Sequence, residues 1–594
     1  MSRHDWLAVA LVPLALIVGV HVLEQVLDDW SVLQRHLHGP DDYLRLVRVT
    51  ELWESGRWFD PVSERTNAPF GEVLHWTRPM DLLLLAGGAL LAPFIGFTDG
   101  LYAWAVVASP LLHVLALFAL IWAFRPLLRT DELALLAILF PLQLYLRFQF
   151  LTARPDHHAL LTLLMIVLAG VLVRLATGTA GRRTLLAGGL ATALMLWLST
   201  EGLLGLALLQ GGAGLVWLVA GTALVGPMRI LSLATFIGLA LALGLERPPD
   251  DWLTVEYDRL SIVHLLLAAL LAAFWSMMAG LAPATDRARR GFGLAGAVAV
   301  IAVMALVFPA FFKGPLAEVD PALMQRWLGN NGEHFRFRPD LPPLAWLPGL
   351  WNDLGIAVLA LPAYALILIR RRNPHMAWLL LALAALAFTA LALPQGRFSG
   401  YAQLFLLPGL AVAVAAAVRL FAGPGLARLG LRTAISIVAV TGFILSAGML
   451  NAWERGRGLH VQTERCPRGE LYSWLDRRFD RPQVVMSFVY AGPEILYWSK
   501  HAAVASPYHR NGAGMWASDR FFSALEPERA RAVAEQRGVG LVVVCARDDE
   551  GVSYLWRNEA NLFRRLAAGD PPDWLVPLEL TENLARWYRV YRRP

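Results

Sequence analysis

The stretch that decides the fold is LAVALVPLALIVGVHVL, residues 7–23, a predominantly apolar run close to the N-terminus. A run of this length can cross a bilayer as a helix. It is followed by EQVLDDW and not by the small residues of a signal-peptide cleavage site, so we expect it to be retained. We interpret it as a first transmembrane helix whose start, behind the short segment MSRHDW, lies in the cytoplasm.

Similar apolar runs recur along the 594 residues, of which 57% are hydrophobic and only 16% charged. Soluble proteins carry about 25% charged residues. The composition therefore excludes a soluble multidomain enzyme, a disordered chain and a fibrous chain. It predicts a polytopic α-helical membrane protein. The net charge of +6 is small for this length, and it predicts no nucleic-acid partner.

Short loops that carry arginine orient the predicted spans, because such loops stay in the cytoplasm. They are residues 125–129, 182–183, 229, 287–290, 370–372 and 428–432. The opposite face receives the loops 24–80, 150–157, 199–202, 246–260, 314–343 and 394–401, and everything after about residue 451. The count is about thirteen spans of ~20 residues each. The short apolar segment 82–97 is interrupted by glycines and a proline, and we predict a re-entrant or interfacial helix there.

Composition changes after about residue 451. We therefore divide the chain into a transmembrane domain, 1–450, with long outer loops at 24–80 and 314–343, and an extracytoplasmic α/β domain, 451–594. The second domain contains the strand-like runs PQVVMSFVY (482–490) and VGLVVVCAR (539–547), and between them the helical pattern DRFFSALEPERARAVAEQRG (519–538). In an oxidising compartment Cys466 and Cys545 can form a disulfide, and the alternative is two buried free thiols.

Residues that can bind a metal ion or a phosphate recur in the loops predicted to face outside. In chain order they are Asp41 and Asp42, Asp156 with His157 and His158, Glu333, and Arg397. Carboxylates and imidazoles that converge on one point can hold a divalent cation. A nearby arginine suits a phosphate, which it can bind with two hydrogen bonds. The combination predicts a site for a lipid-linked phosphate substrate.

Each candidate also has a simpler interpretation when it is taken alone. Asp41, Asp42 and Asp156 can cap helices that begin next to them. Glu333 can be a solvated loop residue, and Arg397 can reach lipid headgroups from the end of a span. Only their convergence in space would distinguish a site from these alternatives.

Taken in this order, the motifs resemble those of the catalytic subunit of oligosaccharyltransferases, which are membrane glycosyltransferases of the GT-C fold. GPDDYLRLVRV (39–49) resembles the first acidic motif of that family, and RPDHHA (154–159) the second. GNNGEHF (329–335) resembles a short motif ending in Glu, and GRFSGYAQLFLLPGLA (396–411) the start of an arginine-bearing span. The resemblance implies the metal ligands Asp41, Asp156, His158 and Glu333, catalytic roles for Asp41, Asp42 and Glu333, and donor-phosphate binding by Arg397.

One diagnostic motif of that family, W-W-D-Y-G, is missing. The corresponding stretch has FVYAG at 488–492, without the aspartate that reads the acceptor sequon. The implied acceptor is therefore a lipid, a glycan or a different protein site. Further contacts to acceptor or donor are predicted for His157, Tyr490, His509 and Arg510. The last two lie in SPYHRNGAGMW (506–516), for which ordinary turn chemistry at Asn511-Gly512 is the alternative.

The implied activity is a metal-assisted, inverting transfer of a sugar or oligosaccharide from a polyprenyl phosphate or pyrophosphate, with Mg or Mn as the cation. We expect it at the outer face of a bacterial cytoplasmic (inner) membrane, with the N-terminus in the cytoplasm and the C-terminal domain in the periplasm. The rival hypothesis is a transporter or flippase for a lipid-linked or small substrate. Transport sites lie near the bilayer midplane on broken helices. The candidates here lie in outer loops, which favours an enzyme.

Overall fold

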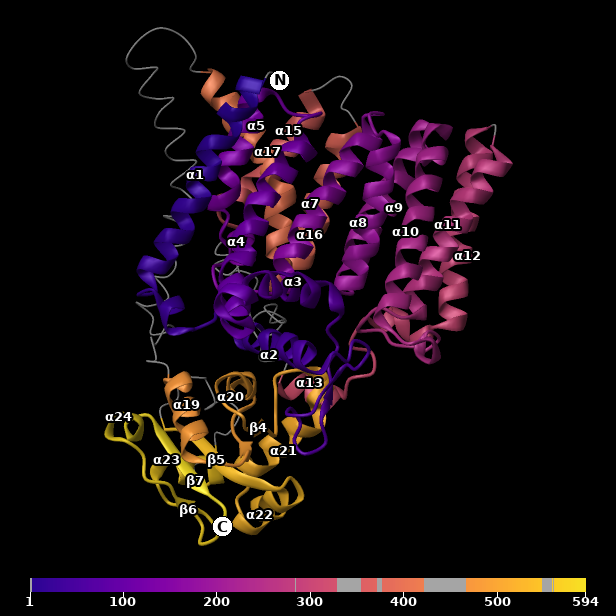
Figure 1. Ribbon diagram of the computed structural model, residues 1–594. Coiled ribbons are helices and arrows are strands. Elements are labelled where there is room, and N and C mark those ends of the chain that lie inside the picture. Colours follow the sequence, from indigo (N-terminus) through magenta and orange to yellow (C-terminus); the bar gives the residue numbers. More distant parts are fainter. Residues whose placement is uncertain are drawn as a thin grey trace, which may run out of the picture.

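The computed structural model describes residues 3–283, 285–327, 354–370, 376–420, 466–546, 558 and 560–594. The chain forms a bundle of long helices and, at one end of it, a smaller domain that contains a β-sheet (Figure 1). The N-terminus lies at the opposite end of the bundle, and the C-terminus lies in the small domain. The predicted fold class, a polytopic helical membrane protein with a C-terminal α/β domain, is confirmed.

Within the described ranges, nine helices are long and apolar enough to cross a membrane. They are α1 (Arg3–Leu27), α3 (Arg78–Ile95), α4 (Phe97–Phe124), α7 (His157–Ala176), α9 (Gly202–Ala220), α10 (Val225–Glu246), α11 (Ile262–Leu281), α12 (Asp286–Val307) and α17 (Ser399–Leu420). Shorter helices of the bundle are α5 (Thr130–Leu139), α6 (Leu144–Phe148), α8 (Arg182–Leu198), α15 (Ala360–Arg370) and α16 (Met376–Ala392). The count of about thirteen spans stays a prediction, because residues 421–465 lie outside the described ranges.

Helix α3 contains most of the segment that we predicted to be re-entrant or interfacial. Thr77, just before α3, donates a hydrogen bond to the carbonyl of Leu198 at the end of α8, 3.2 Å away. Asp99, just after α3, pairs with Arg35 in the loop that follows α1. Both ends of α3 are thus tied to loops at the end of the bundle that faces the small domain, where α3 lies across the bundle (Figure 1). Its length and composition also suit a span, so the interfacial placement stays a prediction.

Glycines in α3 allow a close approach to α4. A Cβ atom on Gly87 would lie 2.1 Å from the indole ring of Trp104 on α4. The Trp104 indole N–H donates to the carbonyl of Leu83, 3.0 Å away. Asp81 near the start of α3 is fully buried and accepts hydrogen bonds from three guanidinium groups, those of Arg45, Arg48 and Arg78.

The segment between α1 and α3 contains α2 (Pro40–Ser55) and a small hairpin of β1 (Val62–Ser63) and β2 (Glu72–Val73). Helix α2 starts at Pro40, whose fixed φ suits a first helical turn, and the carboxylate of Asp42 accepts from the backbone N–H of Gly39 at 2.8 Å. It ends at Gly56, which has a left-handed φ of 64°. Helix α2 lies between the bundle and the small domain (Figure 1).

The small domain contains a five-stranded sheet in the order β4-β3-β5-β7-β6, with β3 parallel to β4 and β5, and β7 antiparallel to β5 and β6. Its strands are β3 (Val484–Met486), β4 (Ala502–Ala503), β5 (Val539–Cys545), β6 (Val576–Pro577) and β7 (Tyr588–Arg592). Its helices are α19 (Arg468–Arg478), α20 (Gly492–Trp498), α21 (Gly512–Ser523), α22 (Pro527–Gln536), α23 (Leu562–Ala568) and α24 (Glu582–Ala585). Both predicted strands are present, as β3 and β5.

The helix predicted over 519–538 is wrong as one continuous element. The chain forms two helices, α21 and α22, separated by Ala524–Glu526. Pro527 explains the break, because a proline disfavours helical backbone in the residue before it and suits the first turn of a new helix.

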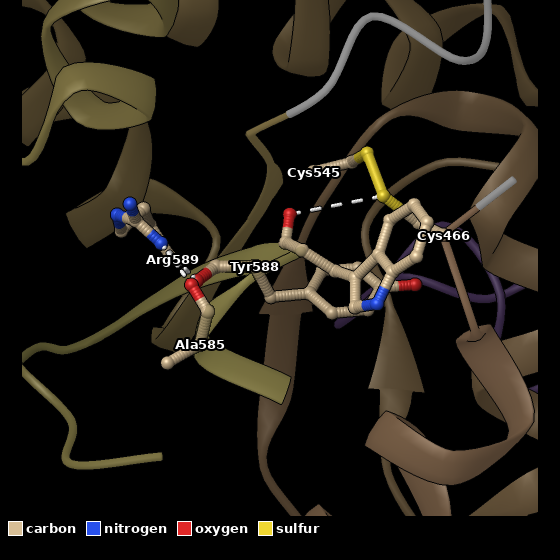
Figure 2. The surroundings of a disulfide bond; sticks show 6 residues. Cys466, Cys545, Ala585, Tyr588 and Arg589 are labelled. Atoms are coloured by element: carbon tan, nitrogen blue, oxygen red, sulfur yellow. Dashed lines mark hydrogen bonds between the residues drawn. A yellow bond between two sulfur atoms is a disulfide. The ribbon is translucent and has the colours of Figure 1, made fainter. Parts of the chain in front are cut away.

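A disulfide links two segments of the small domain, and apolar contacts join the domain to the segments beside it. Cys466, just before α19, forms a disulfide with Cys545 at the end of β5 (Figure 2). One apolar cluster of the domain includes Leu44 and Val47 from α2. Another includes Leu323 of α13 (Pro321–Arg326) and Trp327, which directly follows this helix. The core of the small domain therefore also includes side chains from α2 and from the segment around α13. The predicted boundary at 451 lies outside the described residues.

Candidate functional site

Asp156 stands at the centre of the polar groups that face the small domain. It is the N-cap of α7, and its Oδ1 accepts from the backbone N–H of His157 at 2.7 Å. The imidazoles of His157 and His158 each bring Nδ1 within 2.6 Å of a carboxylate oxygen of Asp156. Capping and clustering thus occur together, so the simpler interpretation of Asp156 as a cap does not compete with a role in a site.

The cluster of Asp156, His157 and His158 has the donor set of a metal site. One ligand atom from each of the three residues lies within 4.8 Å of the others. Carboxylate oxygen and imidazole nitrogen are ligands for Mn²⁺, Zn²⁺ and related divalent cations, whereas Mg²⁺ prefers an all-oxygen set. The residues present therefore fit a divalent cation, and the imidazoles favour Mn²⁺ over Mg²⁺ of the two that the sequence suggested.

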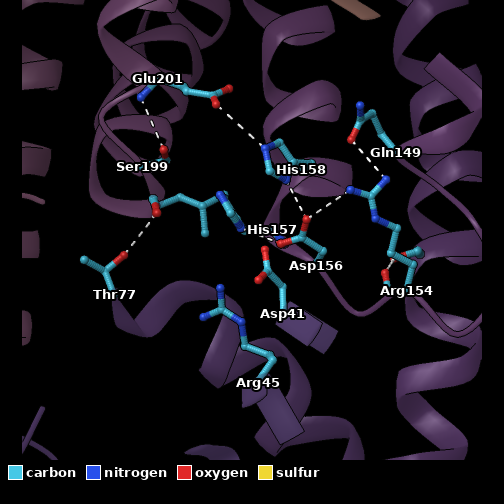
Figure 3. A network of polar contacts seen from close by, with 12 residues as sticks. Asp41, Arg45, Thr77, Gln149, Arg154, Asp156, His157, His158, Ser199 and Glu201 are labelled. Carbon is cyan, nitrogen blue, oxygen red and sulfur yellow. Dashed lines mark hydrogen bonds and ion pairs between the residues drawn. The ribbon is translucent and has the colours of Figure 1, made fainter. Parts of the chain in front are cut away.

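Asp41 and Asp42 have different surroundings. The carboxylate of Asp41 points toward Asp156 and His157 (Figure 3), and its Oδ1 accepts from the hydroxyl of Tyr508 at 3.0 Å. Asp42 is 2% exposed, and one of its oxygens is bonded to Gly39 as a cap. Burial and the nearby charge of Asp156 raise the pKa of Asp42 well above its ordinary value. Asp41 thus faces the Asp156 cluster, whereas Asp42 shapes the start of the helix.

Arg397 reaches the same site from the start of α17. Its guanidinium forms an ion pair with Glu201, and the other oxygen of Glu201 accepts from the hydroxyl of Tyr401 at 3.1 Å. Nε2 of His158 lies 3.7 Å from Glu201 (Figure 3). Glu201 therefore links Arg397 to the Asp156 cluster.

Glu201 was not predicted as a site residue. Its only sequence signal was a carboxylate in a short turn, 199–202, between two apolar helices, and that turn was assigned to the outer face. A buried carboxylate there needs a cationic partner, but the sequence does not show which arginine supplies it.

Electrostatics keep Asp156 ionised. Burial alone would raise the pKa of Asp156, but the imidazoles of His158 and His157 hold it well below its ordinary value. Arg154 adds a weaker contact at 3.4 Å. Arg45 lies below Asp41 (Figure 3), with its guanidinium 4.1 Å from the ring centre of Trp76. The site therefore combines anionic and cationic side chains in a mostly buried setting.

The other predicted site residues lie away from the Asp156 cluster or outside the described residues. Glu333 falls in 328–353, outside the described residues. Tyr490 packs beside Phe488 in the small domain, with ring centres 5.4 Å apart, and its predicted contact with substrate stays a prediction. His509 and Arg510 both bind Asp258, a residue of the loop 246–260 that the sequence did not single out.

No protein-family profile and no curated protein sequence matches the chain. Among solved structures, the apo crystal structure of the Archaeoglobus fulgidus oligosaccharyltransferase is similar, with a TM-score of 0.72 at 15% identity over 96% of this chain and 72% of that one. The same values hold for that archaeal enzyme, AglB, in complex with an inhibitory peptide and a dolichol-phosphate. Its structure tethered to an acceptor peptide with an NVT sequon has a TM-score of 0.70 at 15% identity, over 100% of this chain and 74% of that one. The likeness establishes a GT-C fold of the oligosaccharyltransferase type.

Proposed function

We propose that this protein is a membrane glycosyltransferase that transfers a sugar or oligosaccharide from a polyprenyl phosphate or pyrophosphate to an acceptor at the outer face of a cytoplasmic membrane. The observation that carries the proposal is the meeting of Asp41, Asp156, His158 and Arg397 at one end of the bundle. These residues come from three segments far apart in the chain, and a transporter fold gives no reason for them to gather at the end of the bundle that faces the small domain.

A divalent cation fits the proposal. Asp156 and His158 would hold it together with Asp41, and it would stabilise the negative charge that develops on the leaving phosphate. Manganese suits this mixed oxygen and nitrogen donor set. Glu333, which the family resemblance also implies as a ligand, lies outside the described residues.

The chain's own residues have separate tasks in this proposal. Arg397 binds the donor phosphate, and to do so its guanidinium exchanges the carboxylate of Glu201 for phosphate oxygens. Tyr508 holds the carboxylate of Asp41 toward the acceptor side. Attack on the anomeric carbon from the face opposite the phosphate then inverts that centre.

The acceptor class is set by the small domain. Residues 488–492 form a short 3-10 turn and the beginning of α20, with Phe488 packed against Tyr490. There is no aspartate in this stretch to accept a hydrogen bond from a sequon hydroxyl. This supports an acceptor other than the Asn-x-Ser/Thr sequon.

The test uses full-length protein in lipid nanodiscs with a fluorescent polyprenyl-diphosphate-linked sugar, Mn²⁺ and a set of lipid, glycan and peptide acceptors, with water as the acceptor when none of these is added. We expect release of polyprenyl diphosphate, and a loss of about 100-fold or more in Asp156→Ala and Arg397→Gln. The matched control is Asp519→Asn, which breaks an ion pair to Arg326 (2.9 Å) between the small domain and an outer loop. A donor that stays intact, or that is moved across the membrane unchanged, refutes the proposal and favours a transporter.

A further inference from the structure

A second polar cluster joins the small domain to the loop between α10 and α11. His509 and Arg510, in the short helix η11 (His509–Asn511), contact Asp258 of that loop. Nε2 of His509 lies 2.7 Å from Oδ2 of Asp258. Both side chains are 13% exposed, so they are largely shielded from water but still accessible to it.

Asp258 stays an anion that orients the imidazole. Burial would raise the pKa of Asp258, but the hydrogen bonds from His509 and Arg510 hold it well below its ordinary value. Arg510 donates to both oxygens of Asp258, at 2.6 and 2.5 Å, and to Glu256 at 3.0 Å. A carboxylate only accepts hydrogen bonds, so Nε2 of His509 is the donor and Nδ1 of the neutral ring carries the free lone pair.

The position of His509 relates it to the Asp156 site. The preceding residue, Tyr508, donates to Asp41. The ring of His75 lies 4.6 Å from that of His509 and 6.0 Å from that of Tyr508, centre to centre. Nδ1 of His75 is buried without a hydrogen-bond partner among the described residues. Arg397 is connected to the Asp156 site by Glu201, which lies near His158. The small domain is connected to the site by the hydrogen bond from Tyr508 to Asp41.

We propose that His509 is the general base that activates a hydroxyl acceptor, with Asp258 as its positioning residue. This inference rests on the proposed function, and it assigns the acceptor to the alcohols and excludes the amides. An imidazole oriented by a carboxylate is the arrangement that removes a proton from a hydroxyl nucleophile. An amide nitrogen gains little from such a base, because its proton is far less acidic and its lone pair is delocalised.

Nδ1 of His509 takes the hydroxyl proton while the hydroxyl oxygen forms a bond to the anomeric carbon. The bond between that carbon and the phosphate oxygen breaks, and its electron pair leaves with the polyprenyl phosphate or diphosphate. The imidazolium, stabilised by Asp258, then releases its proton to water.

Several charged groups surround His509. Asp258 pairs with His509 and with Arg510. Glu256 accepts hydrogen bonds from Arg510 as well as from Arg247 and Arg259. The uncharged form of His75 is favoured by burial, which lowers its pKa well below its ordinary value.

The test uses the same nanodisc assay with water as the hydroxyl acceptor, and follows release of polyprenyl diphosphate. We expect His509→Ala to lower kcat by about 100-fold or more with little change in KM. Added imidazole should restore part of this rate, which a purely structural loss would not allow. Asp258→Asn should lower kcat less, and the double variant should be no slower than His509→Ala.

The control is again Asp519→Asn, which loses an ion pair of the small domain without touching His509. Near wild-type kcat in His509→Ala overturns the inference. The inference is also overturned if His509→Ala loses activity that imidazole does not restore and melts at a lower temperature than Asp519→Asn. A wild-type protein that leaves the donor intact refutes the proposed function itself, whereas an active wild type with either of the two results above refutes the inference alone.

Discussion

The carboxyl group of Glu72 should make the docking of the small domain depend on pH. Glu72 on β2 is 3% exposed, and its Oε2 accepts from Ser506 at 2.7 Å and from Asn511 at 2.8 Å, both in the small domain. Burial is the largest influence, and it raises the pKa of Glu72 from 4.5 to about 7 despite these hydrogen bonds. The folded protein therefore holds this proton to a higher pH than the unfolded chain does.

The direction and size of the effect follow from this pKa. Below pH 4.5 both states are protonated, and the neutral Glu72 contributes its full share of stability. As the pH rises from 4.5 to about 7, the unfolded chain ionises first and the folded state loses stability. A difference of about 2.5 pKa units corresponds to roughly 3 kcal/mol, which is fully lost above pH 7.

The measurement is the melting temperature of the purified protein between pH 4.5 and 7.5, for the wild type and for Glu72→Gln. The amide of the variant imitates the neutral acid, so its advantage over the wild type should grow as the pH rises through this window. The control is Glu582→Gln, whose side chain is 90% exposed. Parallel pH curves for wild type and Glu72→Gln would show that the burial of Glu72 does not oppose its ionisation.

Three further predictions concern stability. Replacing Cys466 and Cys545 by serine opens a link between residues 79 positions apart and should cost about 4 kcal/mol, and the wild type under reducing conditions should melt like this variant. Asp81→Asn leaves three buried arginines with a weaker partner and should lower stability by about 3–5 kcal/mol, measured as yield and melting temperature. Gly87→Ala places a methyl group against Trp104 and should cost about 1–3 kcal/mol, whereas Gly211→Ala, where the added Cβ meets no atom within 4 Å, should not.

The sequence was informative wherever a local pattern decided the structure. Apolar runs predicted the helices of the bundle, and the short β-type runs PQVVMSFVY and VGLVVVCAR predicted β3 and β5. The motif RPDHHA predicted an acidic helix start with two histidines, because neighbours in sequence at a cap must lie together. The helix over 519–538 failed for an equally local reason, since Pro527 was not given its usual effect on the residue before it.

Contacts between distant segments could not be predicted in this way. Glu201 pairs with Arg397, which is 196 positions away in the sequence, and His509 pairs with Asp258, which is 251 positions away. Each partner alone is an ordinary charged residue in a loop. Only the packing of α17 beside the turn before α9, and of the small domain on the loop before α11, makes them pairs. The resemblance to a known family implied roles for Asp41 and Arg397, but Asp258 was not among the residues that it implied.

Helix α2 packs Leu44 and Val47 into an apolar cluster of the small domain, and it packs Leu46 and Val49 into the apolar core of the bundle. Asp41 lies in the first turn of this helix, so a shift of the small domain against the bundle would also move the carboxylate of Asp41. A chain that ended before residue 466 would lack the small domain, and Leu44 and Val47 of α2 would then be exposed to water. Substitutions in the small domain that displace α2 should therefore also change the direction in which Asp41 points.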